Sequence, residues 1–195
     1  RGGPSTGIPT KSEQSDLNIA IYGFHGDAPH IVLSALDIGD CAFTTEWAVY
    51  LTEALQTVAI VLSDQSLGQA RSVTDPPAHP PAGPGRRISE STGDDYHRYR
   101  LTEDAISPMA IPGTPGGIYT ADGLEHNEKG TPSSMPLDHQ LQLDKRRNKL
   151  TAYDFGDHWA RIEGTAGDIC LLTWGSSCGT TMEAARRLTA GGAVA

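Results

Sequence analysis

The first residues of the chain, RGGPSTGIPT, form a glycine- and hydroxyl-rich loop that could bind an anion. This loop leads into a predicted helix, which opens with the capping box TKSE at residues 10–13 and runs to about residue 22. Free backbone N–H groups and the positive end of the helix dipole attract carboxylates and phosphates at such a position, and Arg1 could add a bidentate contact. An ordinary N-cap with a preceding turn explains the same residues, and spacing alone favours this simpler interpretation.

A second candidate is the segment GSSCG at residues 175–179, between a predicted strand and a predicted helix. It satisfies the nucleophile-elbow pattern of hydrolases, with Ser177 at the centre and Cys178 as another possible nucleophile. In that fold the acid and then the histidine follow the nucleophile along the chain, but no histidine follows Gly179. A hydrolase would therefore need partners from outside this sequence, and a plain strand-to-helix turn is favoured.

A third candidate lies in residues 106–134, ISPMAIPGTPGGIYTADGLEHNEKGTPSS. The glycines and prolines exclude an ordinary helix or central strand, and a long loop that holds both apolar and polar groups is usually functional. Asp122, Glu125, His126 and Glu128 could offer oxygen and nitrogen ligands to a divalent cation. Their spacing does not choose among a metal site, a polar network and an exposed loop, so we assign no metal to them.

Composition narrows the classes of function. The net charge of −9 argues against nonspecific nucleic-acid binding, and the basic run at residues 145–149 is predicted to be a solvated helix face. The three cysteines, Cys41, Cys170 and Cys178, form no CxxC pair, so this chain encodes neither an iron–sulfur cluster nor a structural zinc site. Sparse cysteine fits a cytoplasmic protein, and no apolar run is long enough to span a membrane.

The elements that would position these residues begin with a parallel sheet. Residues 30–35 and 58–63 read as short apolar strands, and residues 44–57 between them carry apolar side chains at helical spacing. Two continuous apolar strands joined by a helix predict a βαβ unit in a buried parallel sheet.

The rest of the chain is predicted to alternate between irregular and regular segments. Residues 74–87 are proline-rich and read as an extended connector, and residues 95–101 as a strand. A helix with a break near Gly156 is predicted over residues 138–159. A strand at 168–174 and a helix at 180–188 follow, with a domain boundary near residues 165–167. Because the chain starts without Met and its last helix should lead into another strand, we expect it to be an internal piece of a longer polypeptide.

Three segments resemble the α subunit of 2-oxoacid:ferredoxin oxidoreductases, particularly the 2-oxoglutarate type. Residues 1–17 resemble the family block GPSTG-x-PT-x-x-EQ-x-DL, and residues 106–134 resemble the block ISP…PG…Y…DGLEHNE-x-G-x-P. Residues 168–185, DICLLTWGSSCGTTMEAA, resemble the strand–turn–helix that begins the next domain of the family. The first two blocks are long and irregular, so their specificity is high.

The resemblance implies an α/β fold with two parts. Residues 1–165 would be the C-terminal half of a parallel-sheet, pyrimidine-type thiamine-diphosphate-binding domain that is incomplete at its N-terminus. Residues 166–195 would be the first βα unit of a transketolase C-terminal-like domain.

The resemblance also implies oxidative decarboxylation of a 2-oxo acid, with the acyl group passed to coenzyme A and the electrons to ferredoxin. Thiamine diphosphate and Mg²⁺ would be shared with a β subunit, which would carry the iron–sulfur cluster. The chain has no GDG…NN magnesium motif and no cluster ligands, in agreement with that division of labour.

Mapped onto matching positions, Arg1 and Thr10 would contact the substrate carboxylates, and Ser5 and Thr6 would shape their loop. The loop at residues 122–128 would order the structure near the subunit interface. The glutamate that activates the cofactor in this family is not present before Arg1, so no catalytic residue is assigned and this piece alone is expected to be inactive. Two alternatives stay open: a serine or cysteine hydrolase that uses Ser177 or Cys178, and a non-catalytic interaction module.

Overall fold

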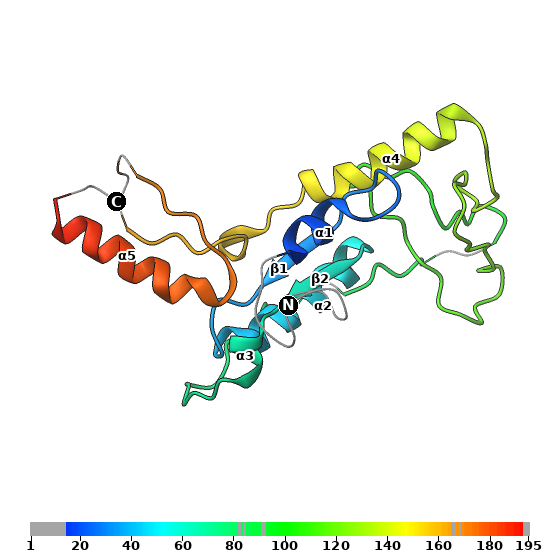
Figure 1. The fold of residues 1–195 in the computed structure, drawn as a ribbon. Helices are drawn as coiled ribbons and strands as arrows, with labels where there is room; N and C mark the ends of the chain where they lie inside the picture. Colours follow the sequence, from blue (N-terminus) through cyan, green and yellow to red (C-terminus); the bar gives the residue numbers. More distant parts are fainter. Residues whose placement is uncertain are drawn as a thin grey trace, which may run out of the picture.

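The computed structural model describes residues 15–81, 83, 85–90, 93–164, 167 and 169–192. In chain order the elements are α1 (Asp16–Tyr22), β1 (Ile31–Ser34), α2 (Asp40–Leu55), β2 (Ala59–Leu62), α3 (Gln65–Gln69), α4 (Pro136–Thr151), the 3₁₀ turns η1 (Gly156–His158) and η2 (Gly175–Ser177), and α5 (Cys178–Ala190). The βαβ unit lies in the middle of the molecule, with α5 at one end and the irregular segment before α4 at the other (Figure 1).

The βαβ unit forms the core and confirms the predicted α/β fold with a parallel sheet. β1 and β2 are paired in parallel, with Ile31 opposite Ala59 and Ser34 opposite Leu62. Leu51 and Leu55 of α2 are fully buried, and Ile31 and Trp47 pack with them in the central apolar cluster. Burial of these side chains on one face of α2 is what fixes the helix against the sheet.

The predicted helix over residues 138–159 is too long at its C-terminal end. Pro136 opens α4 at a position where its missing N–H costs nothing, and the helix ends at Thr151. Tyr153 and Phe155 leave the helical path and pack against the central apolar cluster instead. Gly156 then takes a positive φ of 57° and begins η1, so the chain breaks at the predicted glycine but after several non-helical residues.

Two predicted strands are absent from the described part of the chain. Residues 95–101 form consecutive turns, in which Tyr96 N–H donates to Gly93 and Arg100 N–H to His97. Residues 169–174 belong to no strand or helix, and Leu172 is 96% exposed. A strand needs a run of hydrogen bonds to a neighbouring strand. Residues 95–101 make one backbone hydrogen bond to a distant segment, from Tyr99 N–H to the Glu128 carbonyl at 2.9 Å, which is too little for a strand.

The remaining segments of the chain follow the predicted order of helices and irregular connections, with shifted helix ends. Residues 16–22 are helical, but Ser15 before them is a non-helical N-cap with a φ of −141°, so α1 begins later than the capping box predicts. The box itself, at residues 10–13, lies outside the described residues. The described residues of the connector at 74–87 contain no helix or strand. The last helix, α5, begins at Cys178, inside the predicted turn. None of the described helices has the length and apolar composition that crossing a bilayer requires.

Candidate functional site

The predicted substrate loop cannot be placed. Arg1, Ser5, Thr6 and Thr10 all lie outside the residues that the structure describes, so their roles remain predictions. The other two candidate segments are described almost completely, and they lie in different parts of the fold.

The GSSCG segment lies at the carboxyl edge of the sheet. Ser176 Oγ donates a hydrogen bond to Asp64, which follows β2. Gly175 has a φ of 65°, and a Cβ at this position would lie 3.3 Å from Ser34 Oγ at the end of β1. The turn therefore docks where β1 and β2 both end, which is the edge at which open parallel sheets bind their ligands.

Asp64 connects this turn to α3. Its Oδ1 accepts from the Leu67 N–H at 2.9 Å and caps the helix, while Oδ2 accepts from Ser176. Burial by itself raises the pKa of Asp64, but the hydrogen bonds from Ser176 and Leu67 outweigh it and hold the pKa below its usual value. Asp64 therefore acts as an ionised structural acceptor rather than as a proton carrier.

The same edge does not form a nucleophilic site. Ser177 precedes α5, and its carbonyl accepts from Thr181 Oγ1 at 3.0 Å. Within the described part of the chain, neither Ser177 nor Cys178 has a histidine hydrogen-bonded to its side chain. A hydrolase needs that base, so the geometry gives the hydrolase alternative no support.

The edge also does not fit a diphosphate with its metal ion. Asp40 Oδ2 accepts from the Leu36 N–H at 2.9 Å and from Thr44 at 3.1 Å, and Asp37 Oδ1 accepts from the Asp40 N–H at 2.9 Å. These carboxylates are used inside the fold, and the described residues contain no cluster of His, Cys, Asp and Glu that could hold a metal ion. We therefore derive no step through Mg²⁺ from these residues.

The acidic loop at residues 122–128 is a polar network. Asp122 accepts from the Leu124 N–H at 2.9 Å, and Glu128 from the Leu101 N–H at 2.8 Å. His126 is buried, and its ring lies 3.8 Å from that of Tyr99 between centroids. The spacing left open a metal site, a polar network and an exposed loop. The structure supports the polar network, and the residues it describes contain no group of ligands that could hold a metal ion.

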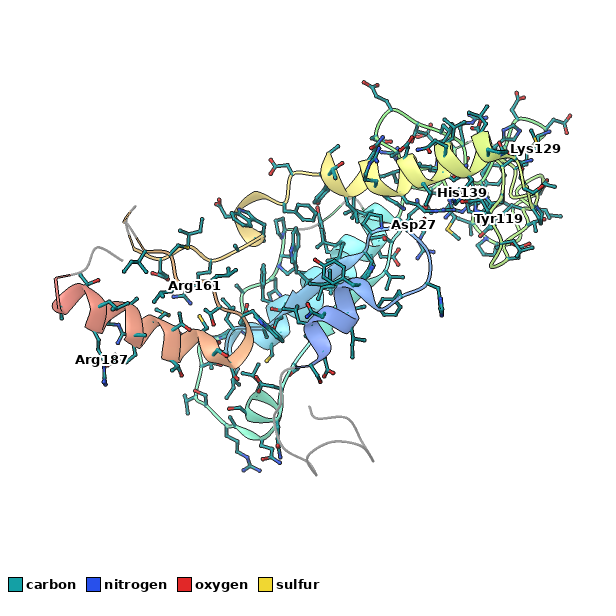
Figure 2. The ribbon with its side chains drawn as sticks, turned by 45° about the horizontal axis from the view of Figure 1, so that its top comes forward. Asp27, Tyr119, Lys129, His139, Arg161 and Arg187 are labelled. Carbon is teal, nitrogen blue, oxygen red and sulfur yellow. The ribbon has the colours of Figure 1, made fainter. Side chains whose placement is uncertain are left out.

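Glu125 fastens this loop to α4. It binds Arg146 at 2.6 Å and His139 at 2.7 Å, and its side chain is only 19% exposed. His139 lies at the end of the molecule that also carries Tyr119 and Lys129, which flank the acidic loop (Figure 2). Burial by itself raises the pKa of Glu125, but the hydrogen bonds from Arg146 and His139 outweigh it and lower the pKa from 4.5 to about 2.

The basic run at residues 145–149 is not a solvated face, which corrects the sequence prediction. Lys145 donates to the Tyr99 carbonyl at 2.9 Å and to Ser107 Oγ, and Lys149 donates to the Gln56 carbonyl at 2.8 Å. Of the basic residues in this run, only Arg147 is exposed. Sequence reasoning missed this because the ammonium groups bind backbone and side-chain oxygens of distant segments, which no local pattern announces.

Comparisons with known proteins agree with the fold. Residues 1–143 match the family model described as "Pyruvate flavodoxin/ferredoxin oxidoreductase, thiamine diP-bdg". The chain is 35% identical over 194 residues to the 2-oxoglutarate oxidoreductase subunit KorA of Mycobacterium tuberculosis, covering 96% of this chain and 29% of that protein. It is 35% identical over 186 residues to the 2-oxoacid:ferredoxin oxidoreductase 1 subunit alpha of Sulfurisphaera tokodaii, with 92% and 29% coverage.

A solved structure is also similar. It is a 2-oxoglutarate:ferredoxin oxidoreductase from Magnetococcus marinus with 2-oxoglutarate, coenzyme A and succinyl-CoA bound. The TM-score is 0.83 and the identity 45%, with 100% of this chain and 34% of that chain covered. The chain thus spans about three-tenths of the length of the curated relatives named above, 29% in each case. These relatives are oxidoreductase subunits, and they give no support to the hydrolase or to the non-catalytic module.

Proposed function

Because the chain belongs to the pyruvate flavodoxin/ferredoxin oxidoreductase family of thiamine-diphosphate-binding domains, we propose that it works within the α subunit of a 2-oxoglutarate:ferredoxin oxidoreductase. The observation that carries the proposal is the likeness to the Magnetococcus marinus enzyme along the whole chain, at 45% identity. The names of that structure's ligands make 2-oxoglutarate and coenzyme A the substrates that we propose for this protein.

The proposed reaction is an oxidative decarboxylation. 2-Oxoglutarate loses carbon dioxide, the remaining acyl group is joined to the thiol of coenzyme A, and the electrons released pass to ferredoxin. Thiamine diphosphate supplies the electron sink that makes loss of carbon dioxide feasible, and the protein orients the substrate against it.

Arg1 and Thr10 are the residues that we propose for holding the substrate. An arginine fork and a hydroxyl suit the carboxylates of a 2-oxo dicarboxylic acid, and Ser5 and Thr6 would shape the loop between them. A dicarboxylate offers one carboxylate beside the reacting carbonyl and a second at the far end. This loop would bind one of them and so set the position of the carbonyl.

The family resemblance also implies a two-part organisation of this chain. We propose that residues 1–165 belong to the pyrimidine-type domain and residues 166–195 to a transketolase C-terminal-like domain. The family model covers residues 1–143, and the hydrogen bond from Ser176 to Asp64 ties the second part to the sheet edge of the first.

The cofactors would be divided between subunits. We propose that a β subunit binds the diphosphate with Mg²⁺ and carries the iron–sulfur cluster. This fits the chemistry of the described carboxylates at the sheet edge, which are occupied by backbone and hydroxyl donors. It also fits a chain whose three cysteines form no ligand pattern.

Calorimetric titration of thiamine diphosphate with Mg²⁺ tests this division. The whole protein co-purified with its β partner is expected to bind the cofactor saturably, whereas the α subunit alone is expected to bind it weakly. Absence of binding heat from the assembled pair at any accessible concentration, or equally tight binding by the α subunit alone, would contradict this division.

A further inference from the structure

A cavity of about 540 Å³ lies at the opposite edge of the sheet from the GSSCG turn. Ala28 and Val58, which precede β1 and β2, line it, so the cavity is at the amino edge. The end of α2, the segment around Arg98 and Ser107, and the inner face of α4 form its other walls. It is therefore separate from the carboxyl edge, where the GSSCG turn contacts Asp64.

Five arginine and lysine side chains line this cavity, and three of them have only uncharged oxygens as hydrogen-bond partners among the described residues. Arg98 donates to Gln56 Oε1 at 2.7 Å, and Lys149 donates to the Gln56 carbonyl at 2.8 Å. Lys145 donates to the Tyr99 carbonyl and to a serine hydroxyl. Among the described ion pairs, none joins any of these three side chains to a carboxylate.

The carboxylates around the cavity are already used. Glu53 is paired with Arg86 at 2.6 Å, and Glu125 with Arg146 at 2.6 Å. The charge of Glu128 raises the pKa of Lys145, but Glu128 makes no hydrogen bond to it: its Oε2 accepts from the Leu101 N–H. A chain with a net charge of −9 therefore keeps a local surplus of positive charge in a partly enclosed space.

Burial, followed by the neighbouring cations, lowers the pKa of both lysines in this cavity. Burial, with repulsion from Lys149 and Arg98, lowers the pKa of Lys145 from 10.5 to about 7. Burial, with repulsion from Arg98 and Arg146, lowers the pKa of Lys149 from 10.5 to about 8. Half-buried like charges destabilise one another, and an anion between them would remove that repulsion.

We propose that this cavity binds a dianionic phosphate group, with Arg98, Lys145 and Lys149 as its ligands. A phosphate offers at least three acceptor oxygens, one for each cation, whereas a single carboxylate offers two. The guanidinium fork matches two phosphate oxygens and the ammonium groups act as point charges beside them. Arg98 is also held over the Tyr99 ring, 5.3 Å from its centroid, which limits the directions in which it can donate.

The phosphate can be free or part of a small ester. The cavity volume of about 540 Å³ exceeds that of a phosphate ion and lies within the range of about 300–1,000 Å³ usual for small-molecule sites. A phosphate monoester with a compact organic body therefore fits as well as the free ion.

Calorimetry on the whole protein, with its partner subunit, tests the site with inorganic phosphate, AMP and adenosine. Saturable binding of phosphate and AMP, but not of adenosine, is expected at low salt. AMP and phosphate of equal affinity would indicate the free ion as ligand, and a clear preference for AMP would indicate a monoester. Absence of binding by both phosphate compounds would overturn the proposal, whether or not the oxidoreductase function holds.

Variants locate the binding. Lys149→Met and Arg98→Met are each expected to weaken phosphate binding at least tenfold, and Lys149→Arg, which keeps the charge, to restore most of it. Arg147→Met is the matched control, because Arg147 is on the same helix but 61% exposed and paired with Asp144. Thermal unfolding confirms that each variant is folded. Equal weakening in Arg147→Met, or phosphate binding unchanged in folded Lys149→Met, would contradict the proposal.

Discussion

Replacing Arg1 by alanine in the whole protein is expected to raise the KM for 2-oxoglutarate by about 30- to 150-fold. A hydrogen bond to a charged group contributes about 2–3 kcal/mol, and each 1.4 kcal/mol is a factor of about ten. Arg1 would hold a carboxylate that keeps its charge throughout the reaction, so the substrate and the transition state lose similar binding energy. The value of kcat should therefore change much less than KM, which steady-state kinetics with varied 2-oxoglutarate measures.

Two controls distinguish a carboxylate contact from a general effect of charge. Arg1→Lys keeps the charge but loses the bidentate fork, so its KM should lie between those of the wild type and of Arg1→Ala. Arg71 is an exposed arginine, and Arg71→Ala should leave KM unchanged. A KM in Arg1→Ala equal to that of the wild type would remove Arg1 from the substrate site.

Replacing Glu125 by glutamine is expected to lower the free energy of local opening of residues 122–135 by about 1–3 kcal/mol at pH 7. The variant leaves Arg146 and His139 without the carboxylate that joins them to the loop. Hydrogen exchange read by mass spectrometry should show amides of this loop exchanging about 5- to 150-fold faster, because local opening becomes easier by that free energy.

The effect of this replacement should depend on pH in a defined direction. The pKa of Glu125 falls from 4.5 to about 2 in the folded protein, so its stabilisation is complete above about pH 5 and is lost as the pH falls toward 2. After correction for intrinsic exchange, wild type and variant should therefore differ less at pH 3 than at pH 7. A difference that grew on acidification would contradict this assignment.

The ion pair between Arg161 and Glu163 provides a matched control. Its N···O distance is 2.6 Å, as in the Arg146–Glu125 pair, but its side chains are 50% and 52% exposed. An exposed pair contributes about 0–1 kcal/mol, so Glu163→Gln should change exchange around residue 163 only slightly. Equal effects in both variants would show that burial does not decide the strength of the Glu125 contacts.

The part of the fold that could be predicted is the part encoded locally. The apolar runs of β1 and β2 and the buried face of α2, with Leu51 and Leu55, are visible in short windows of sequence. The prediction of a strand at residues 168–174 was wrong because a strand forms only when a second strand pairs with it. Its apolar residues are equally compatible with an unpaired extended segment, as Leu172 shows.

The polar contacts of α4 and of the GSSCG turn were harder to predict from the sequence. Leu137 of α4 is 67% exposed while Gln142 is buried, so an apolar-inside reading of that helix chooses the wrong face. Helical spacing places Gln142, Lys145 and Lys149 on one face of α4. Only the structure shows that this polar face, rather than the apolar one, points inward. The contact of Ser176 with Asp64 spans 112 residues and has no local signal.

The most direct test of the central claim is reduction of an artificial electron acceptor by the whole protein assembled with its β partner. We expect dye reduction only when both 2-oxoglutarate and coenzyme A are present, with loss of the signal when either is left out. An assembled, cofactor-loaded pair that reduces no dye with 2-oxoglutarate or any other 2-oxo acid would contradict the assignment.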